Sequence, residues 1–355
     1  MKQEFTVLKT TNPKMKPDPD TLQFGTVFTD HMFIMDYSKE KGWYDGRIVP
    51  YGPIPLDPAA AVFHYAQEFF EGLKAYKTKD DRVLLFRPEM NEKRANLTAE
   101  RLCIPPMPPG LMVKAIKALV SVERDWIPGK EGTSLYIRPF VIATEPFLGV
   151  REAHRYMFII ILSPVGPYYK EGLFPTKIFV ENEYVRAVPG GTGNVKIGGN
   201  YAAALKSQEK AQGNGYSQVL WLDGVERKYV EEIGTSNAFF IIDGEIVTAP
   251  LSGTILPGIT RDSVITLLKS WGEKVAEKRI TIQEIYEAHA AGKLDEVFAS
   301  GTAAVISPVG ELCWQGKKII VNNGEIGRIS QKLYDELTAI QIGKREDPFD
   351  WTTEV

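Results

Sequence analysis

The chain has 355 residues, of which 44% are apolar and 25% charged, a composition typical of a globular protein with room for two domains. Its formal net charge of −3 gives no electrostatic case for binding nucleic acid or an anionic membrane surface. The apolar run at residues 157–162 is too short to cross a bilayer, and the polar, proline-broken residues 1–20 predict no secretory signal.

The first half is predicted to mix strands and helices. The predicted elements are, in chain order, a strand at 82–88, a helix at 90–105, a second helix at 109–128, and strands at 134–146 and 155–165.

Glycine and proline then cluster at residues 166–175. We place an interdomain loop there, between a small N-terminal α/β domain, residues 1–165, and a large C-terminal domain, residues 176–355.

The second half is predicted to begin with a strand and to continue with a helix, turn-linked strands and further helices. Two Asp-Gly pairs, at 223–224 and 243–244, indicate tight turns between apolar runs. The predicted segments are a strand at 176–187, a helix at 199–212, strands within 217–250, a loop and helix at 256–275, a strand pair at 294–310 and a helix at 327–343. The chain is therefore predicted to have a two-domain α+β fold.

The cysteine and histidine counts bound the chemistry. Two cysteines, Cys103 and Cys313, argue against a disulfide scaffold and predict a reducing, cytoplasmic location. Neither has a histidine or a second cysteine at metal spacing, so no metal site is expected.

The segment TGNVKIGGNYAAAL, residues 192–205, holds a lysine inside a glycine-rich loop. A Walker loop needs Gly before the lysine and Ser or Thr after it, where Val195 and Ile197 stand, and a dinucleotide fingerprint needs Gly at position 196. Two interpretations remain for Lys196. It is a solvated loop residue, or it is an amine crowded by Val195, Ile197 and Tyr201, whose lowered pKa suits a Schiff-base nucleophile.

Two patterns suggest anion binding, each with a plainer alternative. In PGIT, residues 257–260, the N–H groups of Ile259 and Thr260 would open a helix and bind phosphate, although Thr260 also suits an ordinary N-cap. In ASGTAAV, residues 299–305, the Thr302 hydroxyl and the N–H groups of Thr302 and Ala303 would face an anion, although a plain hairpin turn fits equally.

Two further patterns place charges in apolar strands. Strand alternation sends the side chains of Glu231 and Glu232 to opposite faces. Either one of them is buried and pairs with a cation, or the two form an exposed acidic pair at the end of the strand. Arg138 shares a face with Tyr136 and meets either a ligand carboxylate or phosphate, or a structural ion-pair partner. A reactive amine, a carboxylate for a ring nitrogen, phosphate sites and an arginine together match pyridoxal phosphate.

The motifs also resemble those of a known family, the branched-chain amino acid aminotransferases of fold-type IV. The resemblance runs from about residue 30 to the C-terminus. The strings that carry it are FFEGLKAY, LFRPEMNEKR, LYIRP, GNVKIGGNYAAAL, EEIGTSN, LPGIT and SGTAA.

The resemblance implies a role for each matching residue. Lys196 matches the catalytic Schiff-base lysine, and Glu232 matches the carboxylate that pairs with the ring nitrogen. The other cofactor-binding residues would be Arg94, Tyr201, Leu256, Ile259, Thr260 and Thr302. The substrate-binding residues would be Tyr65, Phe70, Tyr136, Arg138, Tyr168, Thr302 and Ala303, with Arg138 facing the γ-carboxylate of glutamate. Arg186 also matches an arginine close to the site.

The resemblance further implies ping-pong amino transfer between Leu, Ile or Val and 2-oxoglutarate, in a homodimer with pyridoxal 5'-phosphate as cofactor. Two relatives of the same fold remain alternatives, the D-amino acid aminotransferases and the aminodeoxychorismate lyases. A phosphate- or nucleotide-binding module without covalent chemistry is a third, which the missing loop spacings disfavour.

Overall fold

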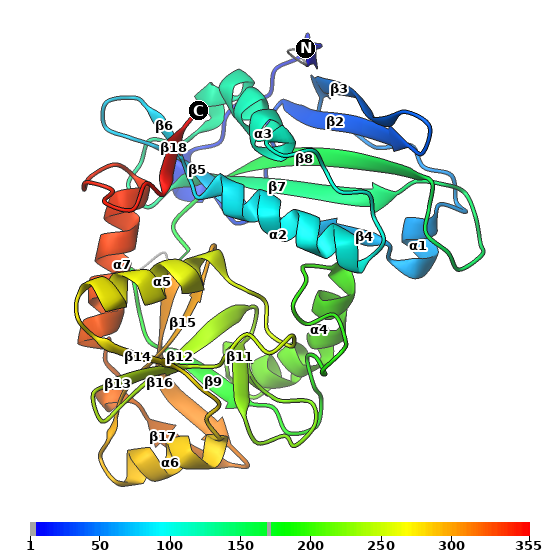
Figure 1. Ribbon diagram of the computed structural model, residues 1–355. Helices are drawn as coiled ribbons and strands as arrows, with labels where there is room; N and C mark the ends of the chain where they lie inside the picture. The colour runs from blue at the N-terminus through cyan, green and yellow to red at the C-terminus, as the bar shows by residue number, and fades with distance from the viewer. Residues whose placement is uncertain (1–4, 169–171) are drawn as a thin grey trace. The chain divides into compact units, whose positions relative to one another are not determined.

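A computed structural model describes residues 5–168 and 172–355. The chain divides into two compact units (Figure 1). Unit 1 comprises residues 1–170, 196–198 and 339–355, and unit 2 comprises residues 171–195 and 199–338. Residues 169–171, part of the predicted interdomain loop, lie outside the described residues. The predicted boundaries of the two domains stay a prediction.

Unit 1 is built on one sheet, in the order β1-β3-β2-β8-β7-β5-β6-β18, with β4 paired to β7. Neighbouring strands run antiparallel except β1 and β3. The strands are β1 (Thr6–Val7), β2 (His31–Ser38), β3 (Gly42–Pro50), β4 (Glu68–Phe70), β5 (Leu73–Lys77), β6 (Val83–Phe86), β7 (Ser134–Ala143), β8 (Arg155–Val165) and β18 (Thr352–Glu354).

Helices α1 (Ala61–Tyr65), α2 (Pro88–Arg101) and α3 (Leu111–Val122) complete unit 1. Helix α2 starts with Pro88 in its first turn, where a missing N–H costs nothing, and buries Asn91, Arg94 and Thr98 on one face. These buried polar side chains of α2 belong to the site described below.

Unit 2 is a closed sheet. Strand β11 pairs with both β10 and β12, so the order β11-β10-β9-β16-β15-β12 returns to its start, while β13 and β14 extend it and β17 pairs with β16. The strands are β9 (Thr176–Val180), β10 (Gln218–Leu222), β11 (Val230–Ile233), β12 (Ser236–Ile242), β13 (Glu245–Thr248), β14 (Lys274–Glu277), β15 (Leu294–Gly301), β16 (Val305–Trp314) and β17 (Lys317–Ile320). The helices are α4 (Gly198–Gly213), α5 (Ile259–Ser270), α6 (Ile282–Ala290) and α7 (Arg328–Gln341).

Several predicted elements are confirmed, and three need correction. The α+β fold class is confirmed, as are the strand pair β15–β16 and the Asp243-Gly244 turn, whose two residues both have positive φ as a type I′ turn requires. The other Asp-Gly pair instead opens a longer loop, since β11 begins only at Val230.

The strand predicted at 176–187 ends at Val180. The helix predicted within 256–275 ends at Ser270, because the apolar spacing beyond it belongs to β14, which pairs with β13. Across residues 5–168 and 172–355, no helix is both long and apolar enough to span a membrane.

Candidate active site

Lys196 is held in unit 1 by its backbone. Its N–H donates to the Thr98 hydroxyl of α2 at 3.3 Å, and its carbonyl accepts from the Phe70 N–H of β4 at 3.1 Å. Two residues on, the Gly198 N–H donates to the Glu68 carboxylate. The loop before α4 is therefore fixed to β4 and α2 on both sides of the lysine.

The Lys196 amine lies in a desolvated, positively charged environment. Its nitrogen is 5.0 Å from the centre of the Phe70 ring. Burial, and then the positive charges of Arg94 and Arg138, lower the pKa of Lys196 to about 8. This does not fit the alternative of a solvated loop lysine, and it gives an amine that is half deprotonated, and so available as a nucleophile or base, at about pH 8.

Arg138 of β7 lies between two aromatic rings. Its guanidinium carbon is 4.6 Å from the centre of the Phe70 ring and 5.3 Å from that of Tyr136, and its Nη2 donates to the Tyr136 hydroxyl at 2.9 Å. Its Nε is buried and has no hydrogen-bond partner among the described residues. A Cβ added to Gly72 would lie 2.2 Å from the Tyr136 hydroxyl, so this packing needs glycine there. Phe70, Tyr136, Arg138 and Lys196 are thus brought together in one unit.

Arg94 forms a buried ion pair with Glu71. Its Nε and Nη2 each donate to the Glu71 carboxylate at 2.8 Å, and Asn91 donates to the same carboxylate at 2.8 Å. Burial alone would raise the pKa of Glu71, but the Arg94 charge and hydrogen bonds hold it below its usual value. Sequence reasoning missed Glu71, although a carboxylate inside the apolar run at 69–76 predicts a buried cationic partner.

The other two aromatic residues of the predicted substrate pocket, Tyr65 and Tyr168, are exposed. Tyr65 ends α1, is 40% exposed and donates its hydroxyl to the Leu148 carbonyl. Tyr168 follows β8 and is 52% exposed.

Unit 2 contains the Glu232 carboxylate, held by a buried arginine. The Arg186 Nε lies 2.8 Å from Glu232 Oε2, and the exposed fractions of the two side chains are 8% and 2%. The Arg186 Nη1 also donates to the carbonyls of Thr254 at 2.8 Å and Gly193 at 3.2 Å. Asn237, paired opposite Glu232 in β12, donates to Glu232 Oε1 at 3.2 Å.

Both acidic residues of β11, Glu231 and Glu232, are buried, so the expectation of an exposed acidic pair is wrong. Glu231 accepts a hydrogen bond from the Thr254 hydroxyl, and burial raises its pKa. Alternation does place the two side chains on opposite faces. Thr254, Asn237 and the role of Arg186 had no local sequence signal.

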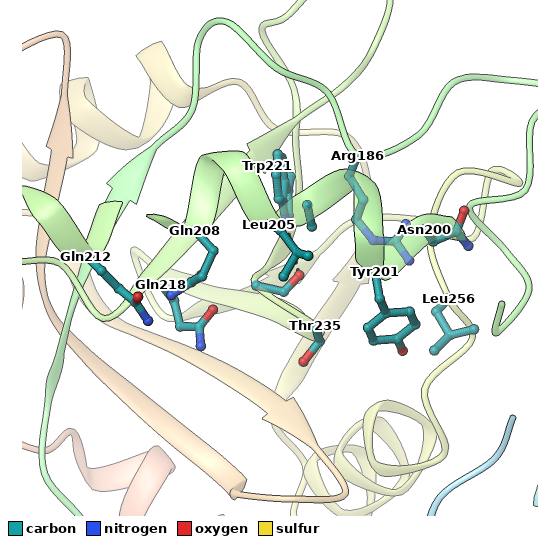
Figure 2. Close-up of a pocket in the computed structure, with 12 residues that line it drawn as sticks. Arg186, Asn200, Tyr201, Leu205, Gln208, Gln212, Gln218, Trp221, Thr235 and Leu256 are labelled. Carbon is teal, nitrogen blue, oxygen red and sulfur yellow. Dashed lines mark hydrogen bonds between the residues drawn. The ribbon is translucent and has the colours of Figure 1, made fainter. Parts of the chain in front are cut away.

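A pocket of about 290 Å³ adjoins this pair in unit 2 (Figure 2). Arg186, Asn200, Tyr201 and Leu256 lie toward one end of it, and Gln208, Gln212 and Gln218 toward the other. Asn200 donates to the carbonyls of Thr192 and Val195 at 2.8 and 2.9 Å, which ties the start of α4 to the preceding glycine-rich loop.

The two segments predicted as anion sites lie at the start of a helix and in a turn between two strands. Helix α5 begins at Ile259 with Gly258 as its N-cap, so Thr260 is not the N-cap and both residues lie in the first turn, where helix N–H groups point outward. Thr302 and Ala303 lie in the turn between β15 and β16. The buried hydroxyl of the adjacent Ser300 has no hydrogen-bond partner within the described parts of the chain.

Comparison with known proteins places this chain in a class. The family described as amino-transferase class IV matches residues 68–312. The chain belongs to this family and is an aminotransferase of class IV.

Individual relatives extend the match over the whole chain. The branched-chain-amino-acid aminotransferase 2 of Bacillus subtilis (strain 168) is 60% identical over 354 residues, covering 100% of this chain and 98% of that protein. The T.th. branched-chain amino acid aminotransferase with pyridoxamine 5'-phosphate is 28% identical, with a TM-score of 0.74 over 90% of this chain and 97% of that one. The same enzyme complexed with N-(5'-phosphopyridoxyl)-L-glutamate is 27% identical, with a TM-score of 0.71 over 90% and 97%.

Proposed function

We propose that this chain transfers amino groups reversibly between branched-chain L-amino acids and 2-oxoglutarate, with pyridoxal 5'-phosphate as cofactor. The observation that carries the proposal is the Lys196 amine, whose pKa is lowered to about 8 beside Phe70, Arg94 and Arg138. A nucleophilic amine of this kind is what covalent attachment of a carbonyl cofactor needs.

The donor set fits pyridoxal phosphate. Lys196 would bind the cofactor covalently, Glu232 would pair with the ring nitrogen, and Tyr201 and Leu256 would contact the ring. The phosphate would be bound by the first-turn N–H groups of Ile259 and Thr260, by Thr302 and by Arg94. The unpartnered buried hydroxyl of Ser300 beside Thr302 is consistent with an anionic ligand at that turn. When bound, the cofactor supplies an electron-accepting ring that stabilises the carbanion left by removal of the substrate's α-proton.

The remaining chemistry falls to the chain's own residues. The Lys196 amine would remove the α-proton and deliver it to the cofactor's carbonyl carbon within the same half-reaction, and it would run this transfer in reverse in the second. A pKa of about 8 suits a base that must also act as an acid near neutral pH. The positive charge of Arg186, 2.8 Å from Glu232 Oε2, would stabilise the negative charge of that carboxylate, and Asn237 would orient it by donating to Oε1.

Substrate choice would depend on Phe70, Tyr136 and Arg138. Burying an aliphatic side chain against the two rings would contribute about 1.5–3 kcal/mol. The buried Arg138 Nε would donate to the second carboxylate of glutamate or 2-oxoglutarate. The N–H groups of Thr302 and Ala303 would hold the α-carboxylate, and Tyr65 and Tyr168 would line the remaining wall.

The comparisons favour this activity over the D-amino acid aminotransferase and aminodeoxychorismate lyase alternatives, because relatives of 54–60% identity over nearly the whole chain are branched-chain enzymes by name.

We propose further that the enzyme works as a homodimer in the cytoplasm. Both cysteines are free thiols, as expected in a reducing compartment. On unit 1, Phe63, Leu148 and Val150 are 61%, 62% and 86% exposed, and the Tyr65 hydroxyl joins helix α1, which carries Phe63, to the Leu148 carbonyl. Exposed apolar side chains on these two segments would mark an interaction surface. Sedimentation of wild type and Val150→Asp tests the point: the substitution should shift a dimer toward monomer, and an unchanged dimer would remove this patch as the interface.

The test of function is the visible absorbance spectrum of the purified holoenzyme. L-Leucine should bleach the cofactor's yellow colour, and 2-oxoglutarate should restore it. Bleaching by D-leucine alone, or by neither enantiomer, would contradict the proposed substrate. Peptide mapping after borohydride reduction should find the cofactor on Lys196.

A further inference from the structure

Glu68, the first residue of β4, occupies a position that the proposed reaction does not account for. Its carboxylate accepts a hydrogen bond from the N–H of Gly198, the first residue of α4 and two residues beyond Lys196. A Cβ added to Gly198 would lie 2.5 Å from Glu68 Oε1, so the contact depends on glycine there. A carboxylate at a helix N-terminus is favourable, which explains why the contact forms.

The same carboxylate belongs to the electrostatic environment of Arg138. Glu68 and Phe70 lie two residues apart in β4 and so share one face of the strand, and the Arg138 guanidinium carbon is 4.6 Å from the centre of the Phe70 ring. Burial raises the pKa of the Glu68 carboxyl, and the Gly198 N–H and the Arg138 charge oppose that rise. Within the described residues, the ion pairs of 4.0 Å or less include none between Glu68 and Arg138, so the two charges interact without direct contact. Glu68 therefore lowers the positive potential at Arg138 while leaving the buried Arg138 Nε available as a donor.

We propose that Glu68 is a specificity-determining residue, whose negative charge offsets Arg138 and favours substrates with an uncharged side chain over substrates with a second carboxylate. The inference rests on the proposed function, in which Arg138 binds that second carboxylate. A dicarboxylic substrate brings a negative charge close to Glu68 and is repelled by it, whereas an aliphatic side chain is indifferent to the same charge. An enzyme that must accept both classes needs an arginine whose attraction is moderated.

Glu68→Gln removes the charge and keeps an oxygen that accepts from Gly198. The affinity for glutarate relative to 4-methylvalerate, measured by titration calorimetry on the holoenzyme, should rise roughly threefold to tenfold. The ratio of kcat/KM for L-glutamate over L-leucine should rise by a similar factor. Glu100→Gln, which removes an exposed carboxylate from the last turn of α2, is the matched control and should leave both ratios unchanged.

A second pair of variants guards against misfolding. Glu68→Asp and Glu68→Asn have the same length and differ in charge, so the rise should appear in the second and not in the first. In an Arg138→Gln background, the effect of Glu68→Gln should disappear, because the charge it offsets is gone.

Three results would overturn the proposal: equal losses for both ligand classes, which would mark Glu68 as merely structural; unchanged ratios; or an effect that survives without Arg138. If the wild type itself fails to consume L-leucine, the proposed function fails. If it consumes both substrates and only the ratio is unmoved by Glu68→Gln, this inference alone fails.

Discussion

The buried ion pair of unit 2 is directly testable by replacing Arg186 with methionine, which keeps much of the volume and removes the charge. The substitution deletes the 2.8 Å contact with Glu232 and the donations to the Gly193 and Thr254 carbonyls. Glu232, 2% exposed, would retain Asn237 but lose its cationic partner. Removing one partner of a buried pair costs about 3–5 kcal/mol, because the other charge stays buried. We therefore expect the free energy of unfolding to fall by about that amount.

The assay is guanidinium unfolding of the cofactor-free protein, followed by circular dichroism and by tryptophan fluorescence, since Trp221 lines the same pocket as Arg186. Arg186→Met combined with Glu232→Gln should be more stable than Arg186→Met alone, because no isolated charge remains. Arg328→Met is the control, since that arginine is 75% exposed and its pair with Glu273 is worth at most about 1 kcal/mol. An Arg186→Met protein as stable as wild type, or losses that simply add in the double variant, would refute the assignment of Arg186 as the cation that stabilises Glu232.

Three further predictions concern unit 1. Labelling of Lys196 by an amine reagent in the cofactor-free protein should rise through about pH 8, because only the deprotonated amine reacts, and a midpoint near the ordinary lysine value of about 10.4 would contradict the buried environment. Arg138→Gln should reduce kcat/KM for L-glutamate at least about tenfold more than for L-leucine, since losing a charge-assisted hydrogen bond costs about 1.5–3 kcal/mol, and equal losses would remove its specific role. Glu71→Gln should destabilise the protein by about 3–5 kcal/mol, because it deletes the negative charge of the buried ion pair with Arg94. It should also move the Lys196 labelling midpoint below that of wild type, because the Glu71 charge raises the pKa of that amine; an unmoved midpoint in folded protein would refute this coupling.

The sequence pattern predicted those elements whose signal lies within a few neighbouring residues. The apolar runs of β7 and β8, the amphipathic α3 and the Asp243-Gly244 turn each have their signal within a few residues. The N-terminal pair β2 and β3 was not predicted, because β3, with the sequence GWYDGRIVP, has neither clear alternation nor a continuous apolar run. Its strand conformation depends on pairing with β2, a tertiary effect that overrides weak propensity.

The candidate site was predicted as a set of residue types rather than as a set of contacts. The resemblance supplied Lys196, Glu232 and Arg138 because short motifs fix their register. Some of the contacts around them join residues far apart along the chain: the Lys196 N–H meets Thr98 across 98 residues, and Arg94 meets Glu71 across 23. No periodicity relates such positions, so pairing them required the fold.

The contacts around Lys196 argue that its reactivity depends on a balance of charges that no one motif contains. If the positive charges of Arg94 and Arg138 had no negative partners, they would hold the neighbouring amine in its neutral form. Such uncompensated buried charges would also lower the stability of the fold considerably. Glu71 offsets Arg94 through two 2.8 Å contacts, and Glu68 opposes Arg138 while also holding the helix that follows the lysine. Each carboxylate therefore has a mechanical and an electrostatic consequence: Glu71 secures α2 and raises the pKa of the amine, and Glu68 secures α4 and moderates the arginine. Substitutions that keep hydrogen bonds but delete charge separate these two consequences, which is why Gln in place of either glutamate is more informative than Ala.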